Sequence, residues 1–380
     1  MSIKEKKEIF VITGESSGDQ HAAKYIKEHN LLNRDIYFSG IGQESMKYQD
    51  VSLIYNSEDI AVVGLTEVIF KYKKIRHALK VAKNHIKKNK PALVVLVDYV
   101  EFNLKIAAYS KSLGIPTLFY IAPQVWAWRK NRINNIINVV DHLAVVFPFE
   151  YDIFSKVSKN VSFVGHPLAD DNELIHSNIN YNDKKYDLGI FPGSRESEIK
   201  NNIYTMLDCI KPSRDNNIKK SNIKIFYSNE KSRKLLEEML PVQMHSWLLS
   251  GKDRGEIKLC KKAITASGTI TLELALMGIP MVIVYQLSSI TYFIMKRLVK
   301  LKYIGLVNLI LGDDLGDEMV VREYIQPKYH DQVEIMAELD KIDYDVDYRN
   351  EIIKKYIRIR DELKPGAAKS LALIADKLIS

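Results

Sequence analysis

Cysteine, proline and glycine are all scarce in this sequence. Its 380 residues include only two cysteines, 11 prolines and 17 glycines. The cysteines, Cys209 and Cys260, are far apart and fit no metal or redox motif, which suggests a reducing compartment rather than a disulfide-bonded secreted protein. The low proline and glycine content argues against long disordered regions. With 46% hydrophobic residues, the chain can bury substantial cores.

Long apolar runs are missing as well. No uninterrupted run reaches the ~20 residues that a helix needs to span a bilayer. The charged N-terminus, Met1–Glu8, has no signal-peptide core and leads directly into a strand pattern. These features predict a cytoplasmic protein.

The usual motifs of metal and cofactor sites are also absent. No His-Glu-x-x-His, paired Cys-x-x-Cys or EF-hand spacing occurs, so we expect no protein-held metal. There is no Walker loop, and the partial dinucleotide fingerprint at Gly40–Ser45 lacks its third glycine, so we expect no cofactor. Asp343-Tyr344-Asp345 resembles the Asp-x-Asp of metal-dependent sugar transferases, but we expect it in a polar connector. The acidic cluster within 313–318 is expected to be solvated.

The net charge of +8 favours an anionic partner. A nucleic acid, an acidic membrane surface and a phosphorylated substrate all fit this charge. The richness in Lys, Asn and Ile can also reflect genomic composition, so the charge alone does not choose among them.

Strand and helix patterns divide the chain into two similar halves. Glu8–Thr13 and Pro91–Asp98 have the apolar pattern of buried parallel strands in the first half. A polar stretch near Asp170–Lys185 predicts a linker, after which the pattern restarts at Tyr186–Phe191. The tail predicts two helices split by Pro365-Gly366. The fold class is therefore α/β.

Two turns in the second half suggest a phosphate site. Ser267-Gly268-Thr269 lies between a short strand pattern and a helix, and Gly193-Ser194-Arg195 follows another strand. Free N–H groups and the positive end of the helix dipole meet at such turns, which suits a phosphate. Glu273, about one turn into its helix, could take two ribose hydroxyls. The alternative is that these residues only cap the helix and complement its dipole.

The first half supplies a candidate general base, Asp98. It ends an apolar strand, and ligands of open α/β sheets bind beyond the carboxyl ends of the strands. An N-cap is the alternative role. Pro123–Arg129 contains two of the three tryptophans beside an arginine, which suggests a substrate wall, with core packing as the alternative. A base in one half and a nucleotide diphosphate site in the other is the layout of a metal-independent glycosyltransferase.

Ile60–Lys90 combines apolar residues with many lysines. The pattern predicts a helix or helix pair with one apolar face and a basic flank. Such a helix can pack on a core, or it can lie on a membrane with its lysines at the headgroups. Gln286–Ile310 has the same character.

The ordered motifs resemble the lipid-A-disaccharide synthase family, which consists of inverting sugar transferases of the GT-B fold. The matching runs extend from residue 14 to about 326 and cover nearly the whole chain. They are Gly14–Asp19, Val63–Val68, Asp98–Asn103, Pro123–Arg129, Phe163–Leu168, Pro192–Arg195 and Ser267–Glu273, with Gly-Glu-x-Ser-Gly-Asp and Pro-x-x-Trp-Ala-Trp-Arg the most specific.

This resemblance implies two Rossmann-like domains that face each other across a cleft. We expect an acceptor domain at 1–170, a UDP-sugar domain at 171–350, and terminal helices at 351–380 that can pack back on the first domain. UDP-2,3-diacylglucosamine would donate its sugar to 2,3-diacylglucosamine 1-phosphate (lipid X), giving a β-1,6-linked disaccharide and UDP. No nucleic-acid partner or cofactor is implied, and a homodimer is left open.

The resemblance also implies roles for individual residues. Asp98 would be the base on the acceptor 6-hydroxyl, with no metal at the departing diphosphate. The expected UDP-binding residues are Ser194, Arg195, Ser267, Gly268, Thr269, Glu273, Asn308 and Gln326. The expected acceptor-side residues are Glu15, Ser17, Asp19, Asn103, Trp126 and Arg129. Because the substrates are acylated, Val62, Val63, Leu65, Val68, Ile69 and Phe70 are expected to form a patch on the anionic cytoplasmic face of the inner membrane.

The sequence departs from the family pattern at two places. Arg322 stands where a proline usually precedes the equivalent of Glu323, and Gln286 stands where an arginine is expected. These departures concern the nucleotide contacts rather than the reaction class. The remaining alternatives are another GT-B enzyme acting on UDP-sugars, such as a 2-epimerase or a muramyl-lipid transferase, and a non-catalytic basic protein that binds membrane or nucleic acid.

Overall fold

The computed structural model describes residues 6–61, 65–122, 132–175, 179–210, 222–286, 303–312 and 319–380, with the backbone alone for 65–70, 132, 329 and 330. The chain forms two compact units. The first comprises residues 1–170 and 363–380, and the second comprises residues 171–362.

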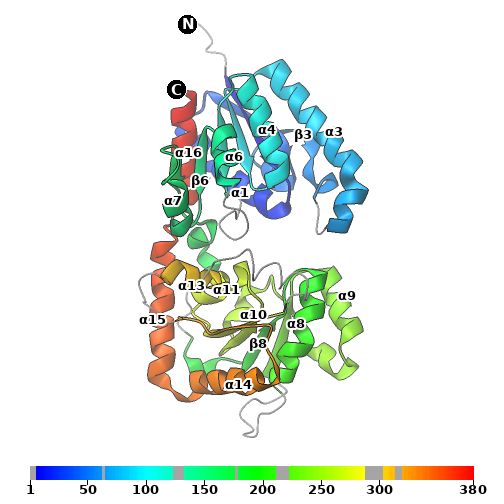
Figure 1. The fold of residues 1–380 in the computed structure, drawn as a ribbon, viewed down its shortest axis with the longest axis vertical. Coiled ribbons are helices and arrows are strands. Elements are labelled where there is room, and N and C mark those ends of the chain that lie inside the picture. Colours follow the sequence, from blue (N-terminus) through cyan, green and yellow to red (C-terminus); the bar gives the residue numbers. More distant parts are fainter. Residues whose placement is uncertain are drawn as a thin grey trace. The chain divides into compact units, whose positions relative to one another are not determined.

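The first unit is a parallel sheet with helices on both faces (Figure 1). Its strands are β1 (Lys7–Thr13), β2 (Ile36–Gly42), β3 (Ser52–Asn56), β4 (Leu93–Val97), β5 (Thr117–Tyr120), β6 (His142–Val145) and β7 (Val161–Phe163), in the order β3-β2-β1-β4-β5-β6-β7. Its helices are α1 (Ser16–Leu32), α2 (Glu44–Lys47), α3 (Leu65–Asn89), α4 (Val100–Ser112), α6 (Arg132–Val139), α7 (Pro148–Phe154) and α16 (Ala367–Ile379), with short 3-10 turns η1 (Ser57–Asp59) and η2 (Pro167–Asp170).

The core of this unit follows from the alternation of side chains along its strands. Phe10, Ile12, Val94 and Leu96 lie in one buried cluster with residues of α3, α4, α6 and α7. The alternate strand residues, such as Val95, are also fully buried, and α1 and α16 pack on the sheet through β4. All five residues of β4 are buried because both faces of the sheet are covered.

The second unit repeats this plan with a parallel sheet in the order β10-β9-β8-β11-β12-β13. Its strands are β8 (Leu188–Phe191), β9 (Ile223–Tyr227), β10 (Leu248–Ser250), β11 (Ala263–Thr265), β12 (Met281–Tyr285) and β13 (Glu323–Ile325). Its helices are α8 (Glu196–Cys209), α9 (Glu230–Met239), α10 (Arg254–Lys258), α11 (Thr269–Leu276), α13 (Leu306–Leu311), α14 (Tyr329–Tyr344) and α15 (Val346–Glu362), with 3-10 turns η3 (Asn172–Leu174), η4 (Tyr181–Asp183) and η6 (Val242–Trp247). Its core cluster joins α8, α9 and α14 to the strands.

The C-terminal tail forms two helices, as its sequence predicts. The second unit extends to Glu362 rather than to 350, because α15 continues to that residue and packs on α11 and α14. The chain then returns to the first unit, where α16 packs against α1 (Figure 1). The Asp170 carboxylate accepts hydrogen bonds from the N–H groups of Gly366 (2.6 Å) and Ala367 (3.2 Å), so it caps α16 at its N-terminus.

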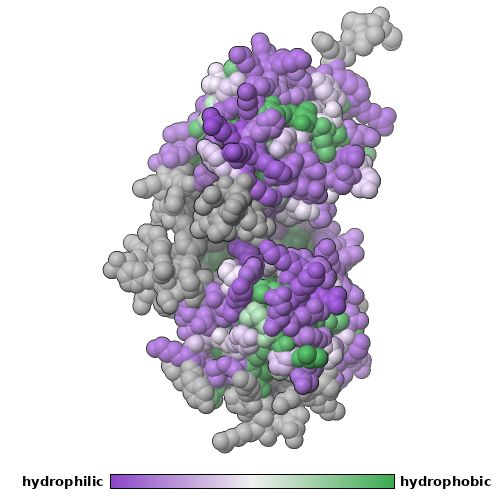
Figure 2. All heavy atoms as spheres, turned by 90° about the vertical axis from the view of Figure 1, so that its right-hand side faces the viewer, coloured by the Kyte–Doolittle hydropathy of each residue, from purple (hydrophilic) through white to green (hydrophobic). Residues whose placement is uncertain are grey.

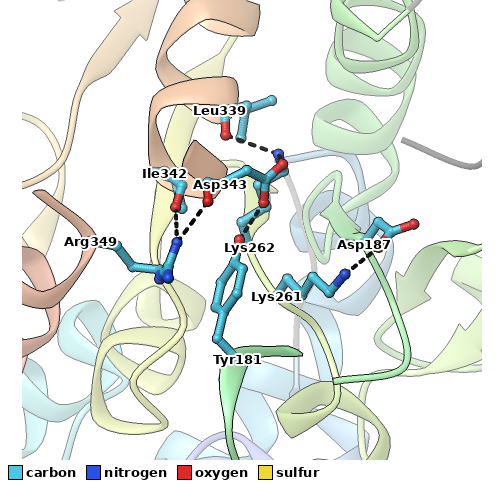
Figure 3. A network of polar contacts seen from close by, with 8 residues as sticks. All are labelled: Tyr181, Asp187, Lys261, Lys262, Leu339, Ile342, Asp343 and Arg349. Atoms are coloured by element: carbon cyan, nitrogen blue, oxygen red, sulfur yellow. Dashed lines mark hydrogen bonds and ion pairs between the residues drawn. The ribbon is translucent and has the colours of Figure 1, made fainter. Parts of the chain in front are cut away.

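A buried polar network joins the linker to the helices of the second unit (Figure 3). The Lys262 ammonium, whose side chain is 0% exposed, pairs with Asp343 and donates to the Leu339 carbonyl at 2.9 Å. The Tyr181 hydroxyl also donates to Asp343, and Arg349 lies over the Tyr181 ring. The expectation that Asp343 lies in a polar connector is therefore wrong, because Asp343 belongs to the last turn of α14 and its carboxylate faces a buried lysine. The acidic cluster at 313–318 lies outside the described residues.

Candidate functional site

Both sheets have one point where the strand order reverses. In the first unit it lies between β1 and β4, and in the second between β8 and β11. Connections leave such neighbouring strands in opposite directions, which opens a crevice at their carboxyl ends, and ligands of open α/β sheets bind there. The loops at these positions begin at Gly14 and Asp98 in the first unit and at Pro192 and Ala266 in the second. These are the loops whose residues the sequence singled out.

Asp98 is partly buried at the carboxyl end of β4. Burial raises the pKa of its carboxyl group above the ordinary aspartate value, and a hydrogen bond from the Tyr99 N–H acts in the opposite direction. The Asp98 N–H donates to the Tyr120 carbonyl at 2.9 Å. The Asn103 side chain donates to the Asp98 carbonyl at 2.7 Å, so Asn103 fixes the backbone of this turn. A partly desolvated carboxylate in a fixed turn suits proton abstraction near neutral pH.

The remaining acceptor-side candidates lie in different environments. Glu15 and Ser17 are exposed in the loop and first turn that follow β1. Asp19 is 1% exposed, and its carboxylate accepts from the N–H groups of Gln43 (2.6 Å) and Ser45 (2.8 Å), so it holds the turn between β2 and α2 rather than pointing to solvent. Trp126 and Arg129 lie outside the described residues.

The loop after β8 presents backbone donors at the N-terminus of α8. Gly193 has a φ of +120° in the left-handed region that favours glycine, and an added Cβ there would clash with the Glu198 side chain. The Glu198 carboxylate accepts from the N–H groups of Ser194 (3.0 Å) and Arg195 (3.2 Å). It also pairs with the Arg195 guanidinium at 3.3 Å, although the Arg195 side chain remains 67% exposed. The loop therefore has two N–H groups and one guanidinium arranged around an anionic group.

The loop after β11 has a second set of donors at the start of α11. Gly268 has a φ of 156° and a ψ of −168°, a conformation adopted almost only by glycine. Thr269 is exposed, whereas the Ser267 hydroxyl donates to the Ile304 carbonyl at 3.2 Å. Within the described residues, neither hydroxyl caps the helix, because α11 has no side-chain cap. The open turn fits the anion site better than the capping alternative.

Glu273 lies in α11 close to a polar concavity. Its carboxylate, 14% exposed, pairs with the guanidinium of Arg254. Burial raises the pKa of Glu273, and Arg254 opposes this shift. Arg254 also lines a concavity of about 620 Å³, together with Glu173, Ser250, Lys252, Asp253, Gly255 and Lys258. Arg254 therefore both pairs with Glu273 and lines the concavity.

Asn308 and Gln326 differ in their placement. Asn308 is 1% exposed; its side chain accepts from the N–H groups of Val320 and Val321 and donates to Glu323 at 2.7 Å. These bonds occupy its amide, so the structure gives Asn308 a role in fixing α13 to β13, which differs from the expected nucleotide contact. Gln326 is partly exposed directly after β13 in a left-handed conformation with a φ of 55°.

Asn202 is a site residue that the sequence analysis did not identify. It is fully buried in α8, where it donates to the Pro192 carbonyl at 3.1 Å and accepts from the Gln286 N–H at 2.7 Å. It therefore connects the loop after β8 to the end of β12. The Gln286 side chain accepts from the Thr205 hydroxyl at 2.6 Å, so it is turned toward α8. No local sequence pattern identifies Asn202 as a residue that supports the loop. Arg195 and Glu198, by contrast, have the spacing of a helix capping box, which can be seen in the sequence.

Helix α3 has a basic exposed surface along its described side chains. Lys73, Lys74, Arg76 and Lys80 are exposed, as is Tyr72, which is 59% accessible. The face shown in Figure 2, on the side where α3 lies in Figure 1, is mostly hydrophilic and has several separate hydrophobic areas. Within the described parts of the chain, no helix has the length and apolar character needed to cross a membrane. The side chains of 62–70 are not among those described.

Sequence comparison finds similar proteins over nearly the whole chain. A family model described as lipid-A-disaccharide synthetase matches residues 9–371. A lipid-A-disaccharide synthase of Geobacter metallireducens is 35% identical, with 95% of this chain and 94% of that protein covered. A lipid-A-disaccharide synthase of Nitrosococcus oceani is 32% identical, with 96% of this chain and 94% of that protein covered.

Structural comparison identifies the fold. The structure of a UDP-GlcNAc 2-epimerase from Neisseria meningitidis bound to UDP-GlcNAc has a TM-score of 0.63 and 11% sequence identity, with 98% of this chain and 99% of that chain covered. At this identity the likeness concerns the fold alone. Together with the two parallel sheets, it confirms the predicted α/β fold with two Rossmann-like units of the GT-B type.

Proposed function

Because the chain belongs to the lipid-A-disaccharide synthetase family, we propose that it is an inverting glycosyltransferase that joins UDP-2,3-diacylglucosamine to 2,3-diacylglucosamine 1-phosphate. The acceptor 6-hydroxyl oxygen forms the bond to the anomeric carbon of the donor as the bond to the diphosphate breaks. The products are the β-1,6-linked disaccharide 1-phosphate of lipid A synthesis and UDP. The main structural support is the placement of candidate residues at the reversal points of both sheets.

In this proposal Asp98 takes the proton of the acceptor hydroxyl. Its raised pKa keeps it basic enough to accept the proton, and such a base typically contributes ~10²–10⁴-fold to the rate. Glu15 and Ser17 lie exposed in the neighbouring loop and are proposed to contact the acceptor sugar. Asn103 acts indirectly, by holding the turn that carries Asp98, and Asp19 acts indirectly, by holding the turn between β2 and α2.

The second unit is proposed to hold the UDP part of the donor. The N–H groups of the Ser194–Arg195 and Gly268–Thr269 turns, with the Arg195 guanidinium, oppose the charge that develops on the departing diphosphate. Glu273 takes the ribose hydroxyls, and the concavity lined by Arg254 receives the nucleoside. Glu198 then has to release the N–H groups that it occupies when the phosphate binds.

Product analysis of the purified protein tests this function. We expect incubation with both acylated sugars, without added metal, to give UDP and a species with the mass of the disaccharide 1-phosphate. A 2-epimerase would change the donor alone and form no disaccharide, and a non-catalytic protein would leave both sugars intact. Either result would reject the proposed reaction.

We also propose that the protein docks on the anionic cytoplasmic face of the inner membrane through the apolar residues at 62–70 and the basic side of α3. The acylated substrates reside in a bilayer, and exposed lysines near its surface each contribute about 1 kcal/mol of attraction. Replacing Val68, Ile69 and Phe70 with Ser is expected to raise the soluble fraction in low-detergent lysates. Whether the chain forms a homodimer is a separate question, which sedimentation of the purified chain would answer.

Exposed valines elsewhere provide the control for membrane docking. Val157 and Val242 are 51% and 77% exposed, and changing them to Ser removes apolar surface without touching α3. These variants are expected to partition like the wild type. If the triple variant at 68–70 also partitions like the wild type, that segment does not dock on the membrane.

A further inference from the structure

The turn that carries Asp98 has an uncommon backbone. Asp98 and Tyr99 both have left-handed conformations, with φ values of 49° and 44°. Neither residue is glycine, and each such conformation costs about 1–3 kcal/mol unless the surrounding structure enforces it. Other residues of the first unit must therefore stabilise the left-handed conformation of this turn.

Part of the restraint comes from the backbone on either side. The Asp98 N–H is bonded to the Tyr120 carbonyl of β5, and the Asp98 carbonyl is bonded to the Asn103 side chain of α4. The Tyr99 N–H lies close enough to the Asp98 carboxyl group to lower its pKa. The direction of the carboxylate therefore depends on the peptide between Asp98 and Tyr99, which in turn depends on where the Tyr99 side chain is fixed.

The Tyr99 side chain is fixed at two places. Its ring lies against Gly14, in the loop after β1, where an added Cβ would overlap the ring. Its hydroxyl donates to the Ile60 carbonyl at 2.7 Å, at the end of η1. The next carbonyl, that of Ala61, accepts from the Lys71 ammonium of α3 at 2.6 Å. Tyr99 therefore connects the Asp98 turn to the β1 loop and to the segment that leads into α3.

We propose that Tyr99 is a positioning residue for Asp98, and that it maintains the left-handed turn by placing its ring on Gly14 and its hydroxyl on the Ile60 carbonyl. The proposal depends on the proposed function, in which Asp98 is the base. Tyr99 does not transfer the proton, because its hydroxyl is committed to Ile60 and burial raises the pKa of that hydroxyl to about 12.

The side-chain hydroxyl can be tested by Tyr99→Phe, which keeps the ring and the fold. We expect kcat to fall about 10-fold with KM for both acylated sugars within about two-fold, because a displaced base weakens the chemical step more than substrate binding. UDP affinity, measured by calorimetry, should not change. Tyr109→Phe makes the same chemical change inside α4, the helix that begins directly after Tyr99, and should behave as the wild type.

The ring contact can be tested by a double-mutant cycle between Gly14 and Tyr99. Gly14→Ala must displace the ring, and we expect it to lower kcat about 10²-fold. Tyr99→Ala removes the ring, so adding Gly14→Ala to it should lower kcat no further. Such non-additivity is expected for residues in contact, whereas independent effects at the two positions would add.

The outcomes separate the two proposals. If Tyr99→Phe keeps the wild-type kcat, or if the effects at positions 14 and 99 multiply, Tyr99 does not position the base. If Asp98→Asn retains full turnover, the base assignment itself fails, whatever the result at Tyr99. If Asp98→Asn is inactive while Tyr99→Phe is unaffected, only the positioning role is rejected.

Discussion

Replacing Asp98 with Asn is expected to lower kcat about 10²–10⁴-fold at neutral pH, because the amide cannot accept the acceptor's proton. Burial raises the pKa of the Asp98 carboxyl group in the folded protein. The basic form is deprotonated, so activity should fall as the pH decreases through this raised pKa. The acidic limb of the wild-type kcat/KM profile should therefore lie above ~3.9, the ordinary pKa of aspartate. Measuring UDP release across the acidic to neutral range tests both expectations.

Arg195→Ala provides the contrasting variant for this experiment. The Arg195 side chain is 67% exposed in the loop after β8, and its removal should weaken UDP binding. Asp98 belongs to the other unit, so Asp98→Asn should leave the UDP affinity measured by calorimetry unchanged. If Asp98→Asn lowers UDP affinity to the same extent as Arg195→Ala, or if it keeps the wild-type rate, Asp98 is not the base.

Much of the fold could be predicted because its strands are buried on both faces. Leu93–Val97 is apolar at every position, which is the pattern of a covered parallel strand, and it ends at a carboxylate. Pro365-Gly366 could be identified because it interrupts these patterns between α15 and α16. The linker predicted at 170–185 falls almost wholly within the second unit, which begins at Asp171. The position of Asp343 could not be predicted in this way, because the last turn of α14 is polar on its exposed side and its sequence resembles a connector. Its partner Lys262 is 81 residues away in sequence, and local periodicity contains no information on such a pair.

The candidate site could be predicted only in part. Asp98, Arg195 and Ser267 follow strands, and the carboxyl ends of parallel strands share one edge of a sheet. The left-handed turn at Asp98–Tyr99 could not be predicted, because it depends on a ring contact with Gly14 and a hydrogen bond to Ile60. Asn308 was expected at the nucleotide, but its polar atoms face backbone groups from a different segment. Residue type alone does not show whether an asparagine bonds to a ligand or to its own protein.

Replacing Asp343 with Ala is expected to lower the free energy of unfolding of the second unit by about 3–5 kcal/mol, the usual cost of leaving one charge of a buried pair without its partner. The Lys262 side chain is 0% exposed, so water cannot replace the lost carboxylate. The Tyr181 hydroxyl would lose its acceptor at the same time. Urea unfolding of the full chain, followed by a signal from the second unit, measures the change, because two units can unfold in separate transitions.

Removing Lys262 and removing Asp343 should lower the free energy of unfolding by different amounts. The Asp343 side chain is 21% exposed, whereas the Lys262 side chain is 0% exposed. Lys262→Met leaves a carboxylate that water and Tyr181 can still reach, so we expect a smaller loss than for Asp343→Ala. The double variant Lys262→Met/Asp343→Ala should be more stable than Asp343→Ala alone, because it removes the uncompensated charge. The neighbouring pair of Lys261 and Asp187, 25% and 12% exposed, is the control: Asp187→Ala should cost less, because Lys261 can be solvated. A double variant no more stable than Asp343→Ala would mean that lost packing, rather than a buried charge, destabilises the protein.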